Sequence, residues 1–336
     1  MVTIAKVAEH CGLSVATVSR VLNNNGPVKP ATCEKVRRAI EELHYTPNQS
    51  ARNLRRNESR IILALAPNFS NPYYSKILAG IGDLSQSLGY SVLICNTGSD
   101  EETERRFLEL LESRRADGAI FLGCRKDVDW LARYAGQYPL VQCSEYVPGL
   151  AAPVVSVDNF AAARETVGHI LSLGHTRIGM IGAANALIST ELRKNGWRET
   201  LLAAGVEPRA EDYAEADGDY TFASGRLAAM RLLDRPDRPT AVFCVSDIIA
   251  LSVIAAAQEL GIRVPEELTV TGFDDVDYTT MFHPYLTTVA QPCCELGKRS
   301  LSVLLEHIED PGKAPEQIHL PHTLTVRESS AAPNPN

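Results

Sequence analysis

The stretch from Thr3 to Asn23 constrains this chain most, because it has the pattern of two short helices joined by a tight turn. Its first half carries an apolar stripe at helical spacing, made of Ile4, Val7, Ala8 and Cys11. Its second half carries another, made of Val18, Val21 and Leu22. Between the stripes, Gly12 can end the first helix and Ser14 can cap the second. The second helix keeps a face of small side chains that fits a DNA major groove, so the stretch predicts a helix-turn-helix module.

A helical hairpin of this spacing also occurs inside larger cores, and two further features favour the DNA-binding interpretation. Pro30 opens a third helical pattern with the stripe Cys33, Val36, Ile40 and Leu43, so residues 1–45 can close a three-helix unit. The first 60 residues hold 10 Lys and Arg against 5 Asp and Glu, whereas the remainder holds 23 against 36. A positive module on an acidic body indicates that only the small module meets phosphate.

These residues resemble the DNA-binding headpiece and hinge of the LacI (lactose repressor) family. The resemblance rests on TIAKVAEHCGLSVATVSRVLN and, further along, YTPNQSARNLRRNESR. Two positions of the first helix depart from the family pattern, Lys6 where Asp is usual and Cys11 where Ala is usual. The similarity extends through residue 328 and is greatest to the cytidine-responsive branch of the family.

The segment 46–60 joins the two parts of the chain. Thr46 can cap and Pro47 can start a helix reaching Arg56, but a helix this short is marginal alone in water, so a disordered basic linker is the alternative without DNA. The resemblance implies a hinge helix that folds on DNA and inserts Leu54 into the minor groove. The residues expected to contact DNA are Thr3, Ser14, Val15, Ala16, Thr17, Ser19, Arg20 and Asn23 in the module, and Arg52, Leu54 and Arg55 in the hinge.

From Ile61 onward, short apolar runs alternate with helical stretches, which is typical of parallel sheets. The expected strands are 61–66, 91–96, 118–123, 139–143 and 154–157 in one sheet, and 177–182, 240–245 and 268–273 in another. The predicted fold class is an N-terminal all-α helix-turn-helix headpiece plus an α/β bilobed effector domain, 61–328, which resembles a periplasmic binding protein.

The resemblance implies that the chain crosses three times between the two lobes. The segment 285–292 and a helix from Glu295 to His307 are expected to return to the first lobe, and a last strand, 319–326, to cross back. The first lobe would then comprise about 61–160 and 288–318, and the second about 161–287 and 319–328. Residues 329–336 are expected to form a disordered tail.

Ligands of such sheets bind beyond the carboxyl ends of the strands, where two sets of ends would face each other across a cleft. Carboxylates at these ends suit a polyhydroxyl ligand, Arg193 can donate in a planar fork, and aromatic rings can cover a ligand ring. The candidate effector-binding residues are Tyr73, Tyr74, Tyr146, Asp158, Arg193, Tyr220, Asp247 and Asp274. Helix capping is an equal alternative for Asp158 and a rival for Asp274, and one of the adjacent tyrosines is expected to pack between lobes. Leu187 stands where purine-binding relatives carry Arg, which favours a neutral ligand.

An enzyme is the rival class, but no GxSxG, HExxH, P-loop or GxGxxG motif follows the expected strands. The eight cysteines form no CxxC pair, and His169, His175 and His283 lack metal-ligand spacing, so neither metal nor cofactor is expected. A transport-type binding protein would carry a signal peptide, which this sequence lacks, so a cytoplasmic location is expected.

The prediction is a homodimeric, ligand-controlled transcriptional repressor that binds pseudo-palindromic double-stranded DNA. The resemblance implies a nucleoside effector, cytidine, acting as inducer, and a neighbouring DNA-bound activator as a further partner. A family member that responds to a sugar or to a corepressor is the alternative.

Overall fold

The computed structural model describes residues 2–22, 26–45, 58–125 and 130–334. The chain divides into two compact units, Met1–Ser59 and Arg60–Asn336, which are described separately below. No helix in these described ranges is long and apolar enough to span a membrane. The same ranges hold no cluster of His, Cys, Asp and Glu suited to a metal ion.

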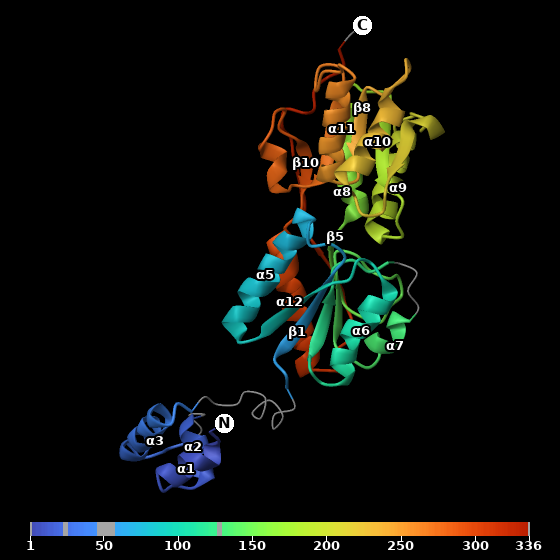
Figure 1. Cartoon of the computed structure of the whole chain (residues 1–336). Coiled ribbons are helices and arrows are strands. Elements are labelled where there is room, and N and C mark those ends of the chain that lie inside the picture. Colours follow the sequence, from blue (N-terminus) through green and yellow to red (C-terminus); the bar gives the residue numbers. More distant parts are fainter. Residues whose placement is uncertain (1, 23–25, 46–57, 126–129, 335–336) are drawn as a thin grey trace. The chain divides into compact units, whose positions relative to one another are not determined.

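The first unit contains the three predicted helices, α1 (Ile4–His10), α2 (Val15–Leu22) and α3 (Pro30–Glu42) (Figure 1). Their packed core consists of Val7, Ala8, Cys11, Val18, Val36 and Ala39. Thr3 caps α1 by accepting a hydrogen bond from the Lys6 N–H, and Ser14 accepts one from the Thr17 N–H at the start of α2. Gly12 lies in the turn with φ +60°, a conformation that costs glycine little, so the turn can be tight.

The second unit contains two six-stranded sheets, and each sheet defines a lobe. The sheet of lobe 1 has the order β11-β5-β4-β3-β1-β2 and is parallel throughout. Its strands are β1 (Ile61–Ala66), β2 (Ser91–Asn96), β3 (Gly118–Phe121), β4 (Leu140–Cys143), β5 (Val154–Val157) and β11 (Gln317–Leu320). Four of these strands are almost wholly buried, as expected for a parallel sheet covered on both faces.

The sheet of lobe 2 has the order β12-β10-β9-β8-β6-β7, with only β12 antiparallel to its neighbour. Its strands are β6 (Ile178–Ala183), β7 (Tyr213–Ala216), β8 (Ala241–Cys244), β9 (Thr269–Asp274), β10 (Thr287–Ala290) and β12 (Thr323–Thr325). The edge strand β7 is not predicted by the sequence, because its half-exposed side chains form no apolar run.

Helices cover both faces of each sheet (Figure 1). Those of lobe 1 are α5 (Pro72–Leu88), α6 (Glu101–Glu112), α7 (Leu131–Ala135) and α12 (Cys293–Glu309). Those of lobe 2 are α8 (Asn159–Ser172), α9 (Ile188–Ala203), α10 (Phe222–Leu233) and α11 (Asp247–Glu259), with short 3₁₀ turns at Ala210–Asp212 and Asp277–Thr280. Successive side chains of β1 point into two different cores on opposite faces of the lobe 1 sheet. Ile62 packs with α5 and α12, whereas Leu63 packs with α6 and α7.

Two expectations about the later crossings are wrong in detail. The segment 285–292 was expected in lobe 1, but its strand β10 pairs with β9 in lobe 2, and only the following helix α12 packs on the lobe 1 sheet. The expected strand 319–326 is two strands, because β11 joins β5 in lobe 1 and β12 joins β10 in lobe 2. Each crossing therefore lies in the short segment between two strands or between a strand and a helix.

The expected disordered tail is also wrong for its described part, 329–334. Ser329 is fully buried and donates its N–H to the Tyr285 carbonyl at 3.0 Å. Its own carbonyl accepts from the Val270 N–H at 2.8 Å, and its hydroxyl oxygen accepts from the Thr287 N–H at 2.8 Å. The segment thus satisfies backbone groups of β9 and β10 that would otherwise be buried without partners.

Candidate DNA-binding and effector sites

The face of α2 that points away from the core of the first unit carries the predicted base-contacting residues. Ser14, Val15, Ala16 and Arg20 are exposed, and Thr17 and Ser19 are half-buried. Val15 keeps 39% of its surface accessible, so its apolar side chain is available for contact with a thymine methyl group. Thr3 is exposed beside α1. The predicted contacts Asn23, Arg52, Leu54 and Arg55 lie outside the described residues.

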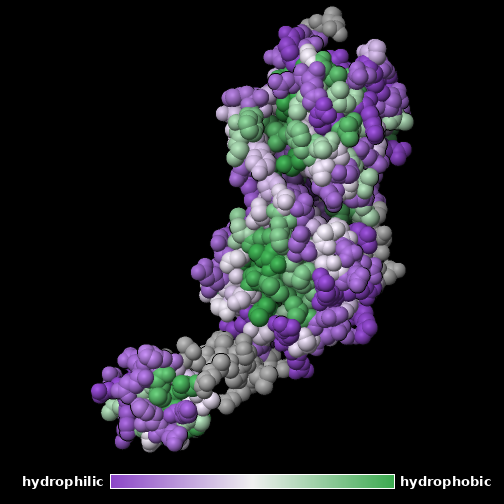
Figure 2. All heavy atoms as spheres, in the orientation of Figure 1, coloured by the Kyte–Doolittle hydropathy of each residue, from purple (hydrophilic) through white to green (hydrophobic). Residues whose placement is uncertain are grey.

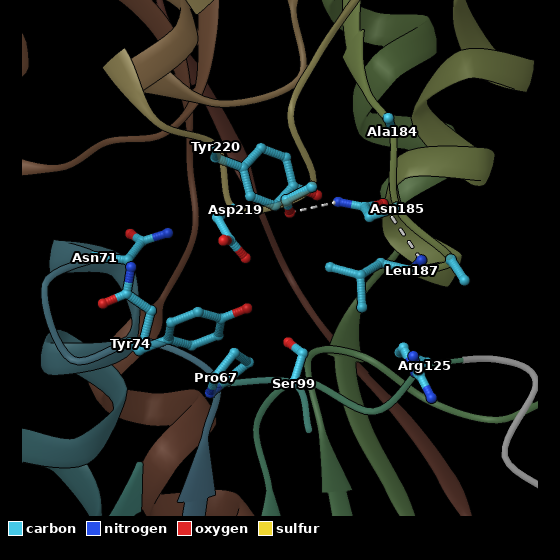
Figure 3. A pocket seen from close by; sticks show the side chains of 13 residues that line it. Pro67, Asn71, Tyr74, Ser99, Arg125, Ala184, Asn185, Leu187, Asp219 and Tyr220 are labelled. Carbon is cyan, nitrogen blue, oxygen red and sulfur yellow. Dashed lines mark hydrogen bonds between the residues drawn. The ribbon is translucent and has the colours of Figure 1, made fainter. Parts of the chain in front are cut away.

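The second unit has a cavity of about 270 Å³ between its lobes (Figure 3). Lobe 1 contributes Pro67, Asn68, Asn71, Tyr74, Ser99 and Arg125 to its lining. Lobe 2 contributes Ala184, Asn185, Ala186, Leu187, Gly218, Asp219 and Tyr220. These residues follow strands β1, β2, β3, β6 and β7 at their carboxyl ends, which is the position expected for a ligand site in this architecture.

Two of the predicted aromatic residues, Tyr74 and Tyr220, flank this cavity from opposite lobes (Figure 3). Tyr74 belongs to the first turn of α5, which Asn71 caps by accepting a hydrogen bond from the Tyr73 N–H at 3.0 Å. Tyr220 has φ +55° and shares a 2.7 Å hydrogen bond with the Thr190 hydroxyl of α9. The Thr190 contact holds the Tyr220 ring, and the Tyr74 ring packs against the Tyr73 ring with their centroids 5.5 Å apart.

Arg193, Asp274 and Tyr73 lie together in a buried polar network and are not part of the cavity wall. The Arg193 guanidinium donates to the Asn159 side-chain oxygen at 2.9 Å and to the Val245 carbonyl at 2.6 Å, and lies over the Phe273 ring at 3.5 Å. Its nearest Asp274 carboxylate contact is 3.9 Å.

Gln291, in the segment between β10 and α12, connects Asp274 and Tyr73. It donates its amide N–H to Asp274 at 2.8 Å and accepts a hydrogen bond from the Tyr73 hydroxyl at 3.2 Å. Tyr73 thus performs the lobe-packing role that one of the adjacent tyrosines was expected to have.

Burial raises the pKa of Asp274 to about 7, although the nearby Arg193 charge opposes this effect. Asp274 also has φ +120°, and the next residue, Asp275, has φ +55°. A side chain in this region of backbone space costs about 1–3 kcal/mol and persists where surrounding contacts hold it. The carboxylate is therefore kept at the lobe junction at a cost in stability, which is typical of a functional position.

Asp247 is fully buried at the first position of α11 and accepts hydrogen bonds from the Val276 N–H at 2.9 Å and the Thr288 hydroxyl at 2.5 Å. Burial, and then the neighbouring Asp274 charge, raise its pKa well above the usual range. These contacts make Asp247 a support for the loop after β9, directly behind Asp274.

The remaining two predicted effector residues lie elsewhere. Asp158 is exposed and caps α8, since its carboxylate accepts a hydrogen bond from the Ala161 N–H at 2.9 Å. Tyr146 is half-exposed and lines a different cavity of lobe 1, beside Val147 to Leu150 and Pro315 to Gln317. The structure does not bring either residue to the interlobe cavity.

Sequence reasoning missed Glu145, a buried carboxylate from the loop after β4. It accepts hydrogen bonds from the N–H and the hydroxyl of Ser189, the second residue of α9 in lobe 2. Burial raises its pKa, and the Ser189 hydrogen bonds oppose that shift. Its position two residues after a strand was the available signal, the same one that singled out Asp158. Asn71, Ser99, Arg125 and Asp219 of the cavity wall were also missed, because loop residues carry no periodic pattern.

A small basic helix-turn-helix unit joined to a two-lobed unit with an interlobe cavity defines a class of protein, the ligand-binding transcriptional regulators. Comparison with known proteins agrees: the family of bacterial regulatory proteins called the lacI family matches residues 3–48, and a periplasmic binding protein-like domain matches residues 167–330.

The chain is 37% identical over 308 residues to the HTH-type transcriptional repressor CytR of Escherichia coli, covering 91% of this chain and 90% of that protein. It is 34% identical to the HTH-type transcriptional regulator DegA of Bacillus subtilis, covering 99% of both. A crystal structure of the lac repressor dimer bound to operator and the anti-inducer ONPF superposes with a TM-score of 0.89 at 30% identity, covering 98% of this chain and 99% of that one. The chain belongs to the LacI family and is a DNA-binding transcriptional repressor with a ligand-binding domain, not an enzyme.

Proposed function

We propose that this repressor is induced by a nucleoside, cytidine, which binds between the lobes and lowers affinity for the operator. The observation that carries this proposal is the interlobe cavity flanked by Tyr74 and Tyr220 (Figure 3). Aromatic rings on two sides offer a base or sugar ring the flat apolar contact that it needs. Leu187 adds an apolar, uncharged surface, which favours a neutral ligand. Cytidine itself comes from the resemblance of the sequence to the cytidine-responsive branch of the family.

Ribose hydroxyls would be recognised in the buried network next to the cavity. Asp274 and Arg193 already bind protein groups there, so a hydroxyl entering between the lobes would exchange with Gln291 or with the Val245 carbonyl rather than find unpaired partners. Because Gln291 connects the two lobes, this exchange would couple effector binding to lobe movement. A sugar inducer or a corepressor would use the same carboxylate and guanidinium, and these remain the alternatives.

The repressor would act as a homodimer on a pseudo-palindromic operator, because one headpiece offers too small a surface for specific affinity. Support comes from exposed apolar side chains on both lobes, namely Leu88, Leu93 and Ile94 on lobe 1 and Tyr278, Met281 and Phe282 on lobe 2. Figure 2 shows a hydrophobic area on lobe 1 around α5. Contiguous exposed apolar areas are typical of protein–protein interfaces.

The segment 46–60 is proposed as the hinge, with Leu54 as the wedge in the minor groove. Ligand-driven lobe movement in the dimer would change the distance between the two hinges and so unfold them. By linkage, operator must weaken effector binding by the same factor as effector weakens operator binding.

Calorimetry tests this proposal by titrating cytidine into the protein alone and into its complex with an operator duplex recovered by selection from a random pool. We expect cytidine to bind about 5- to 150-fold more weakly to the complex. Uridine and ribose, titrated in parallel, test the base and the sugar separately. Equal cytidine affinity in both conditions would contradict control by this ligand, and tighter binding to the complex would identify a corepressor.

Two variants test whether Arg193 and Asp274 belong to the effector site. Arg193→Ala and Asp274→Ala should still bind the operator duplex but should not release it when cytidine is added, because the first unit is unchanged and the hydroxyl contacts are lost. Normal release from both variants would place the effector elsewhere.

A further inference from the structure

The chain passes from the DNA-binding unit into lobe 1 at Arg60, and the backbone of this residue is held on both sides. Its N–H donates to the Asp117 carboxylate, immediately before β3, at 2.7 Å. Its carbonyl accepts from the Ser91 N–H at the start of β2 at 2.9 Å. Its φ is +54°, a conformation that a non-glycine side chain rarely adopts and that these contacts maintain. The backbone of Arg60 is therefore fixed by contacts within lobe 1.

The side chain of Arg60 reaches a third element, the carboxyl end of α5. The guanidinium donates to the carbonyl of Leu88, the last residue of that helix, at 3.4 Å, and lies over the Tyr90 ring at 5.2 Å. A cation at a helix carboxyl terminus is stabilised by the partial negative charge of its unpaired carbonyls. A displacement of this end of α5 would therefore change the side-chain contacts of Arg60, the residue at which the linker begins.

The opposite end of α5 lies at the effector cavity and at the lobe junction. The capping residue Asn71 and Tyr74 of the first turn line the cavity. One turn further, the Lys76 ammonium contacts lobe 2 twice, at the Asp277 carboxylate (2.8 Å) and the Asp275 carbonyl (2.9 Å). With 17 residues, α5 spans about 25 Å at the rise of an α-helix. One helix therefore joins the cavity to Arg60.

Glycine contacts bring the backbones of α5 and its neighbour α12 very close together. A Cβ at Gly80 of α5 would lie 2.1 Å from the Cys294 carbonyl oxygen, and one at Gly297 of α12 would lie 2.1 Å from the Ile77 carbonyl oxygen. Backbones this close interlock, because each glycine receives the backbone of the other helix. If α5 and α12 move as a packed pair, a shift at the cavity end of α5 also displaces its Leu88 end.

We propose that Arg60 is a positioning residue for induction, which transmits the movement of α5 to the start of the DNA-binding linker. The inference rests on the proposed effector control. It assigns Arg60 no contact with the effector, and its role in DNA binding is to orient the linker. Without the Arg60 side chain, effector and operator should each still bind, but effector binding should no longer change the affinity for operator.

The test uses the full chain, cytidine and the selected operator duplex, and measures cytidine affinity with and without duplex. In the parent the two affinities should differ by about 5- to 150-fold, and in Arg60→Ala by less than about 3-fold, with cytidine affinity of the DNA-free protein unchanged. Arg60→Lys retains the positive charge but not the planar group over Tyr90, so it should also lose coupling. Arg106→Ala, which removes an exposed arginine from α6, is the control and should keep it.

The outcomes distinguish this inference from the proposed function. A parent without any coupling contradicts the proposed function itself. A coupled parent with an equally coupled Arg60→Ala contradicts the role of Arg60. Asp117→Asn, which weakens the contact to the Arg60 N–H without changing shape, should reduce coupling as well. If both variants instead lose cytidine binding or unfold at low temperature, Arg60 holds lobe 1 together and the inference is wrong.

Discussion

Glu145 of lobe 1 accepts two hydrogen bonds from Ser189 of lobe 2, one from its N–H at 3.1 Å and one from its hydroxyl. Ser189 lies in the first turn of α9, where the positive end of the helix stabilises a carboxylate. The two lobes are thus joined by a charge-assisted contact. This contact gives the first prediction.

Ser189→Ala removes one donor from a carboxylate that stays buried. Because hydrogen bonds to charged groups contribute about 1.5–3 kcal/mol, we expect the free energy of unfolding to fall by about that amount. Denaturant unfolding measures it. Ser87→Ala, on the exposed side of α5, is the matched control and should change stability little. A loss no larger than that of the control would show that the interlobe contact is not formed in solution.

Cytidine affinity should depend on pH through Asp274, whose pKa burial raises to about 7. Hydroxyls donate to the ionised carboxylate, so binding should tighten as the pH rises from about 6 to 8. Asp274→Asn should bind more weakly and show a flatter profile over this range. Calorimetry at several pH values decides; a parent profile as flat as that of the variant would remove Asp274 from the site.

The same raised pKa gives a stability prediction with a defined sign. Between its ordinary pKa near 4 and about 7, the folded state binds the Asp274 proton more than the unfolded state does, so stability falls as the pH rises through this window. Asp274→Asn lacks this titration. The difference in free energy of unfolding between parent and variant should therefore change in favour of the variant from pH 5 to pH 7, and a constant difference would contradict the shift.

Phe282 is 68% exposed, and Phe282→Asp should weaken the proposed dimer by placing a charge in its apolar contact. Sedimentation should show a larger monomer fraction, and operator affinity should fall because two headpieces no longer act together. Leu202→Asp, which alters a 43% exposed leucine on α9, serves as the control. A parent that is monomeric on its operator would contradict the dimer.

The C-terminal segment should contribute to the stability of lobe 2. Ser329→Ala leaves the buried Thr287 N–H without its acceptor, which should lower the free energy of unfolding by about 1–3 kcal/mol. Deletion of residues 335 and 336 is the comparison and should have no effect of this size. Unchanged stability of Ser329→Ala would show that the segment does not pack in solution.

Substitutions in the DNA-binding unit should divide into two kinds. Val15→Ala should change which operator bases are preferred by about 1–3 kcal/mol for the affected base pair, because Val15 is exposed at the start of α2. Leu54→Ala should lower affinity for every operator and leave cytidine affinity intact. Binding selections and gel shifts measure both, and normal operator affinity of Leu54→Ala would disprove the hinge assignment.

Local patterns in the sequence determined the three helices of the first unit and most strands of the second. Helix stripes, caps and buried apolar runs depend on residues a few positions apart, so they can be read without knowing the fold. The carboxyl-end rule for parallel strands also predicted Tyr74 at the cleft, because it follows the first expected strand.

Only the tertiary structure decided what depends on distant pairing. Strand β10 joins lobe 2 because Thr287–Ala290 matches the register of Thr271–Asp274, and no local pattern contains that partner. Ser329 is buried because β9 and β10 leave backbone groups that it can satisfy. Glu145 meets Ser189, and Asp158 only caps a helix, because side-chain contacts between lobes depend on how two sheets far apart in the sequence face each other. A hydrogen bond across such a junction requires both partners in place, and the sequence specifies them one at a time.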